Sequence, residues 1–186
     1  HTIRIEIDDA AGNTTTQWVT FYTDITDPTI SAFAPDDSDT KITNPVVSWT
    51  ASDNRGIAAT QVFVDGVEEV GFISGNAIAT TLDEGPHTIE LRVTDNSTNQ
   101  SSAFANFFVD LTAPTLNITA PTTVDTNVTS PVISWTESDN RTLVASRVYV
   151  DNVLQPGFTS GSAYSGSLDD NSHTVRVEIN EAAGNT

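Results

Sequence analysis

Residues 87–93 read HTIELRV, and this short stretch decides the fold class. Its apolar side chains alternate with polar ones, a period of two that is typical of a strand with one face in a core. The stretch occurs again as HTIRIEI at residues 1–7 and as HTVRVEI at residues 173–179. The three copies therefore predict the same strand in three successive structural units.

An internal repeat of 86 residues separates these copies, whose first residues stand at positions 1, 87 and 173. Residues 1–86 align on residues 87–172 without a gap. Within that alignment, NPVVSWTASDNR at 44–55 matches SPVISWTESDNR at 130–141. A repeat of this kind indicates tandem structural units rather than one large domain.

Further alternating runs end at Asp65-Gly66 and at Asp151-Asn152. Asp, Asn and Gly tolerate positive φ, so both pairs predict tight hairpin turns. Strands separated by roughly ten residues, with turn signals between them, are typical of antiparallel sandwiches. We therefore expect an all-β protein of tandem immunoglobulin-like antiparallel β-sandwiches, with about seven strands each. Trp49 and Trp135 are expected in their cores.

Two segments with a Pro, DITDPT at 24–29 and DLTAPT at 110–115, are predicted linkers between domains. Pro fixes its own φ and favours an extended residue before it, so the linkers are expected to be short and stiff. These boundaries give three parts. Residues 1–26 are the last two strands of one domain, 27–112 are a complete domain, and 113–186 are a domain without its last strand. We expect the chain to be a window on a longer array.

The composition excludes several function classes. With 25 acidic residues, 7 basic residues and a formal net charge of −18, nucleic acid is not an expected partner, because phosphate binding needs clustered Lys and Arg. No apolar run approaches the roughly 20 residues of a membrane helix, so no membrane insertion is expected in this segment. Since the chain has no Cys, thiolate metal sites and disulfides are also excluded.

No catalytic set is evident, and we predict that the protein is not an enzyme. The three His residues, His1, His87 and His173, occupy one repeat position at the start of a strand. A catalytic His is expected once per site, so a turn-capping role fits this pattern better. The acidic residues likewise fall in turns that recur with the repeat.

Carboxylate and amide side chains are expected to gather where each linker meets the following domain. Calcium takes 6–8 oxygen ligands, so these side chains are candidate calcium ligands at the domain junctions. The alternative is a solvated acidic surface in which Asp and Asn serve turn geometry. The candidates are Asp24, Asp27, Asp53, Asn54, Asp95 and Asn96 for the complete domain, and Asp110, Asp139, Asn140 and Glu181 for the next. The opposite pole of the complete domain is expected to add Asp36, Asp37, Asp39, Asp83 and Glu84.

Two surface features remain open. Trp18 and Tyr22 align with Phe104 and Phe108 as outward aromatic pairs, which favour lateral packing or sugar stacking unless a loop covers them. Sequons for N-glycosylation give possible glycan sites at Asn13, Asn96, Asn99, Asn117, Asn127 and Asn140.

The pattern LDxGxHTIxxxVxD at residues 82–95, followed by the Pro-containing linker, resembles bacterial and archaeal immunoglobulin-like repeats. So does DxxGN at residues 9–13, although residues 95–99 read DNSTN instead. The resemblance covers the whole chain. It implies an extracellular or cell-surface location in an adhesin, a surface-layer protein, a filament or a secreted multidomain enzyme.

Together these features predict a structural repeat segment that acts as a stiff spacer, with neighbouring copies of the same repeat as partners. One alternative is an accessory ligand- or carbohydrate-binding module of a secreted multidomain protein, with glycans or other cell-surface molecules as partners. A further alternative is a subunit of a fibre assembled by strand donation, in which a strand from one chain fills the vacant position in another.

Overall fold

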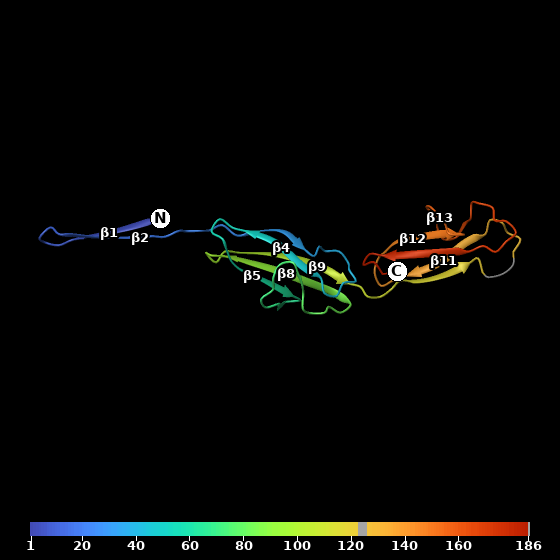
Figure 1. The fold of residues 1–186 in the computed structure, drawn as a ribbon, viewed down its shortest axis with the longest axis horizontal. Coiled ribbons are helices and arrows are strands. Elements are labelled where there is room, and N and C mark those ends of the chain that lie inside the picture. The colour runs from blue at the N-terminus through green and yellow to red at the C-terminus, as the bar shows by residue number, and fades with distance from the viewer. Residues whose placement is uncertain (123–125, 186) are drawn as a thin grey trace. The chain divides into compact units, whose positions relative to one another are not determined.

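The computed structural model describes residues 1–122 and 126–185, and these residues form strands, turns and loops (Figure 1). Residues 123–125 and 186, which fall within the predicted domain 113–186, lie outside them. Two compact units make up the chain. The first contains His1–Ala34, Val46–Ile78 and Ile89–Ala105, and the second contains Pro35–Pro45, Ala79–Thr88 and Asn106–Thr186. The domain boundaries expected from the linkers stay a prediction.

The first unit opens with an antiparallel hairpin of β1 (Thr2–Asp8) and β2 (Thr14–Thr20). The alternation expected for β1 is present, and its apolar residues Ile3, Ile5 and Ile7 are exposed. A hairpin with an uncovered apolar face is not stable by itself in water, so this face needs a partner layer.

Two antiparallel sheets follow the first linker. One has the order β3-β4-β7, formed by Thr29–Ala34, Val46–Ser52 and Asn76–Ala77. The other has the order β6-β5-β8-β9, formed by Val67–Glu68, Ile57–Val64, Gly85–Asp95 and Gln100–Val109.

The second unit repeats this plan 86 residues later. Its sheets have the orders β10-β11-β14, formed by Thr115–Ala120, Val132–Ser138 and Ser162–Ala163, and β13-β12-β15, formed by Val153–Gln155, Leu143–Val150 and Val175–Glu181. The register repeats as well, because Val62 faces Leu91 and Val148 faces Val177. The all-β class and the antiparallel pairing are thus confirmed.

Alternation along the strands places one side of each sheet in a core. Val47, Val62, Ile89, Leu91 and Val93 are completely buried. Burial of one such side chain stabilises the folded state by about 1.5–3 kcal/mol. In the second unit the corresponding cluster consists of Ile133, Trp135, Val148, Val150 and Val177.

The two Trp residues differ in burial. Trp135 belongs to the core cluster, as predicted, and its indole N–H donates to Glu137 Oε2 at 2.8 Å. Trp49 is only half-buried, with its ring 6.2 Å from that of Phe72. The residue equivalent to Glu137 is Ala51, which offers no side-chain acceptor to the Trp49 indole.

The predicted hairpin turns are confirmed. Asp65 and Gly66 have φ of 49° and 81°, and Asp151 and Asn152 have φ of 48° and 65°. Two successive residues at positive φ match the twist of the flanking strands. Among the described residues, no helix is long and apolar enough to cross a membrane.

The repeated His caps a turn at two of its three positions, as the sequence predicts, whereas the ring of His1 contacts the Thr23 hydroxyl. His87 Nε2 lies 2.9 Å from the carbonyl oxygen of Asp83, and His173 Nε2 lies 3.2 Å from that of Asp169. His173 Nδ1 also contacts Asp151 Oδ2 at 2.7 Å. The Asp151 carboxylate and the Asp169 carbonyl both favour the protonated ring, so they raise the pKa of His173 above its usual value.

This shift predicts pH-dependent stability of the second unit. A raised pKa in the folded state stabilises that state fully below the usual His pKa of about 6.5, and the contribution is lost as the pH rises through the higher folded value. We therefore expect the melting temperature of the wild type to fall between about pH 5.5 and pH 8.5 more than that of His173→Gln. Calorimetry in EDTA measures both. Equal pH dependence in the two proteins would show that the contact does not stabilise the fold.

Candidate metal sites at the two linkers

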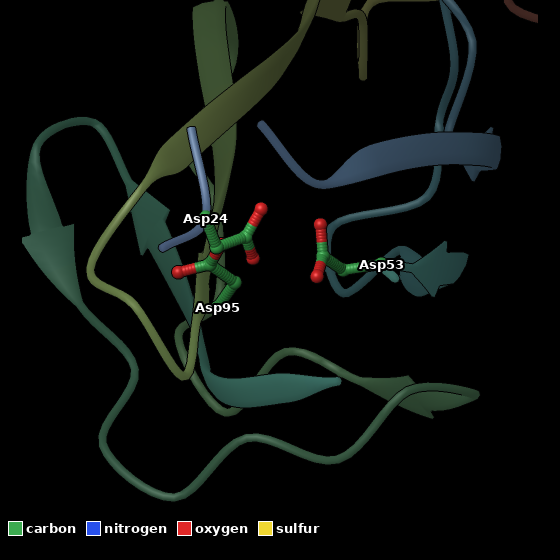
Figure 2. A group of neighbouring side chains, drawn as sticks. All are labelled: Asp24, Asp53 and Asp95. Carbon is green, nitrogen blue, oxygen red and sulfur yellow. The ribbon is translucent and has the colours of Figure 1, made fainter. Parts of the chain in front are cut away.

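Three carboxylates converge where the first linker meets the following sheets (Figure 2). Asp24 lies in the linker after β2, Asp53 in the loop after β4, and Asp95 at the end of β8. One oxygen from each lies within 4.8 Å of the others, and Figure 2 shows Asp53 facing Asp24 and Asp95. These three residues form the first carboxylate cluster.

The second carboxylate cluster consists of Asp110, Asp139 and Glu181, again with one oxygen of each within 4.8 Å of the others. Its members stand 86 residues after those of the first cluster. Asp110 is completely buried and Glu181 is 4% exposed, so most of this charge is shielded from water. Shielded like charges at this separation repel one another strongly, because the interior screens them less than water does.

The linker Asp of each cluster has one satisfied oxygen and one unsatisfied oxygen. Asp24 Oδ1 accepts from the Thr26 N–H at 3.1 Å, and Asp110 Oδ1 accepts from the Thr112 N–H at 3.1 Å. The second oxygens, Asp24 Oδ2 and Asp110 Oδ2, are buried without a hydrogen-bond partner.

The loop Asp of each cluster likewise has one hydrogen-bonded oxygen and one oxygen without a partner. Asp53 Oδ2 accepts from the Arg55 N–H at 2.6 Å, and Asp139 Oδ2 accepts from the Arg141 N–H at 3.0 Å. Asp53 Oδ1 and Asp139 Oδ1 are buried and unpartnered. A buried carboxylate oxygen without a partner costs about 1–3 kcal/mol or more, and a bound cation or water would remove that cost.

Hydrogen bonds hold the third carboxylate in position. Asp95 accepts from the backbone N–H groups of Ser97 and Asn99 at 2.7 and 2.8 Å, and from the Asn99 amide at 2.8 Å. Burial raises the pKa of Asp95, but these hydrogen bonds outweigh burial and the pKa lies below its usual value. Asp95 is therefore ionised at neutral pH. Glu181 takes the same place in the second cluster and accepts from the N–H groups of Ala183 and Asn185.

An Asn four residues after this carboxylate clamps the linker. The Asn99 amide donates to the carbonyl oxygens of Asp24 and Thr26 at 3.3 and 3.1 Å. The Asn185 amide donates to those of Asp110 and Thr112 at 2.9 and 3.3 Å. We name these two sets the Asn clamps. The sequence did not lead us to predict a role for these Asn residues. A signal was present, because an acidic residue followed four residues later by Asn occurs in all three copies of the repeat.

The donor set suits a hard divalent cation. Each cluster offers three carboxylates and no nitrogen or sulfur ligand, a composition that favours calcium or magnesium over zinc. Calcium accepts 6–8 oxygens in flexible geometry, whereas magnesium needs a near-ideal octahedron and retains its waters. Clusters built from a linker, a loop and the end of a strand therefore fit calcium better.

The structure brings together six of the ten candidate ligands. Asp27 and Asn54 are exposed and lie outside the clusters. The Asn96 amide donates to the Arg55 carbonyl at 2.7 Å, and the Asn140 amide donates to Glu84 Oε1 at 2.7 Å. Asn96 and Asn140 thus make direct contacts outside the carboxylate clusters.

The acids expected at the opposite pole make direct contacts instead. Asp36 accepts from Ser38 and Asp37 from the Asn106 N–H. Asp39 and Glu84 bind the loop after β11. Asp83 contributes the carbonyl oxygen that His87 contacts.

The possible glycan sites separate into two groups. Asn99 is part-buried, and its amide serves the Asn clamp, so a glycan there would break that contact. The amides of Asn13, Asn96 and Asn140 make hydrogen bonds as well, and the glycan sites stay predictions. The remaining acceptor residues are exposed: Asn13, Asn96, Asn117, Asn127 and Asn140.

One member of each outward aromatic pair lies beneath a loop arginine. The Arg55 guanidinium lies 4.2 Å from the Tyr22 ring centre, and that of Arg141 lies 4.2 Å from the Phe108 ring centre. The partners Trp18 and Phe104 are exposed. Both contacts are cation–π interactions, but Tyr22 remains 70% exposed, so the covered alternative fits only the part-buried Phe108.

No family model and no curated protein matches the sequence. Among solved structures, the chain is similar to fibronectin(III)-like modules of Clostridium thermocellum CbhA, with a TM-score of 0.53, 14% identity, and coverage of 85% of this chain and 87% of that one. It is also similar to the glucan-locus protein SGBP-B of Bacteroides ovatus, with a TM-score of 0.36, 16% identity, and coverage of 87% and 66%. The first similarity supports an immunoglobulin-like, fibronectin III-like β-sandwich, and at this identity it shows the fold alone.

The Asn clamp generates a stability prediction. Asn185→Ala leaves the carbonyl oxygens of Asp110 and Thr112 without their donor, and we expect the free energy of unfolding of the second unit to fall by about 1–3 kcal/mol. Urea denaturation measures the change. Asn127→Ala, at an exposed position, is the matched control and should change it by less than about 0.5 kcal/mol. Equal effects of the two variants would contradict the clamp.

Proposed function

We propose that this chain is a non-catalytic spacer segment of an extracellular, cell-surface array, in which repeated sandwiches set length and stiffness. The observation that carries the proposal is the repetition of one linker design. The same Asn clamp and the same kind of carboxylate cluster occur at both linkers, 86 residues apart. A feature that recurs at every joint fits a mechanical role, since binding specificity needs a site that is unique in the chain.

Calcium is the cation that we assign to both clusters. It would replace the missing partners of the buried carboxylate oxygens and tie each linker to the domain that follows. It would also lower the repulsion within a chain of net charge −18. Neighbouring copies of the repeat are then the principal partners, and the array stiffens when calcium is present.

Calcium at about 1 mM should raise the melting temperature of the chain above its value in EDTA. It should also narrow the distribution of distances between two dyes attached on either side of the second linker. A cation at 100 times its dissociation constant stabilises the folded state by about 2.7 kcal/mol. Asp110→Asn should remove most of the effect at the second linker. Asp170→Asn, which changes the same charge outside the cluster, should preserve it. Unchanged melting and distances on calcium addition would refute the assignment.

Strand donation is the alternative mode of assembly, because β15 is an edge strand of the described residues beside a groove lined by Pro114, Leu116, Val177 and Ile179. The two modes differ in the size of the particle formed by the purified chain. Light scattering of a spacer segment gives a mass that is independent of concentration. A mass that grows in multiples of 19.8 kDa with concentration would establish strand donation.

A further inference from the structure

Three consecutive residues after β11 have three different contacts. Asp139 belongs to the second carboxylate cluster. The amide of Asn140 donates to Glu84 Oε1 at 2.7 Å. The guanidinium of Arg141 binds both oxygens of Asp39 at distances of 2.7–3.0 Å and lies over the Phe108 ring. One short loop therefore connects a cluster ligand to two acids from earlier in the chain.

The pairing of Arg141 with Asp39 is stronger than an ordinary surface ion pair. Its geometry is bidentate, and the side chains are 34% and 16% exposed. Bidentate charge-assisted hydrogen bonds fix orientation as well as adding energy. The pair therefore fixes the position of loop 139–141.

The other two ligand-bearing segments are held in a similar way. Glu84 Oε2 accepts from the Thr112 hydroxyl at 2.7 Å, two residues after Asp110. Lys41 Nζ donates to the Gly184 carbonyl at 2.6 Å, in the turn that follows Glu181. Asp39, Lys41 and Glu84, which we name the docking set, thus contact every segment that supplies a carboxylate to the second cluster.

We infer that the docking set controls the calcium affinity of the second cluster by holding its three carboxylates together before the cation arrives. This inference rests on the proposed calcium site. Three negative charges at this separation drive the segments apart, and contacts around the ligands offset that repulsion. When the ligands are already in place, the cation does not have to order them, so it binds more tightly. By reciprocity, the cation strengthens the docking contacts.

Arg141→Ala is the decisive variant because two explanations predict opposite signs. If only the local charge matters, loss of a positive side chain strengthens calcium binding. If the docking set organises the ligands, loss of the Asp39 contact frees loop 139–141 and weakens binding, and we expect about a tenfold increase in the dissociation constant.

Titration of the full chain with calcium chloride, followed by NMR of the Asn99 and Asn185 amides, reports the two clusters separately. In Arg141→Ala the second cluster should weaken while the first, an internal control for folding, stays unchanged. Asp39→Asn should weaken the second cluster similarly, and the double variant should add little because both changes break one contact. Arg147→Ala, on exposed β12 surface, is the matched control for charge and should leave both clusters unchanged.

Arg141→Lys keeps the charge but loses the bidentate contact with Asp39. If the docking set organises the ligands, this variant should bind calcium several-fold more weakly at the second cluster. If only the local charge matters, its calcium affinity should not change. Unchanged or tighter binding at the second cluster in Arg141→Ala overturns the inference and leaves the calcium sites standing. A wild-type chain in which neither cluster binds calcium overturns the proposed function, and the inference with it.

Discussion

The burial of a charged linker residue is the constraint on which the rest of the structure depends. Asp110 is completely buried, and one of its oxygens has no partner in the described residues. An uncompensated buried charge is costly, so the surrounding segments have to supply compensation. The Asn185 amide holds the Asp110 backbone carbonyl, whereas the carboxylates of Asp139 and Glu181 add negative charge, so a cation bound by the three carboxylates would supply the compensation.

The same contacts at the linker occur in both copies of the repeat. In residues 24–26 and 110–112, the backbone carbonyls accept from an Asn amide and the Asp carboxylate accepts from a Thr backbone N–H. In the proposed array, each linker would be clamped to the domain that follows it, so stiffness would accumulate with copy number without contacts between distant repeats. A high negative charge favours separation of the repeats, and divalent cations would set how far they can bend.

The two copies are not identical, and their differences show which contacts the design tolerates. Glu181 replaces Asp95 and is held by the same pair of backbone N–H groups, so the longer side chain still reaches the cluster. Trp135 donates a hydrogen bond to Glu137 for which Trp49 has no equivalent acceptor, since position 51 is Ala. Both copies retain the carboxylate cluster and the Asn clamp, whereas the Trp is buried in only one of them.

The sequence by itself determined the period, the strands, the hairpin turns and the candidate ligand types, because alternation and turn chemistry are local and the 86-residue repeat displays them more than once. Only the tertiary structure decided which acids meet. It brought six of the ten candidates together, assigned Asp39 and Glu84 to direct contacts, and placed the Asn99 amide in the clamp. Side-chain direction and loop packing depend on contacts between residues far apart in the chain, such as Arg141 with Asp39, 102 positions away, and Lys41 with Gly184, 143 positions away, and no local pattern encodes them.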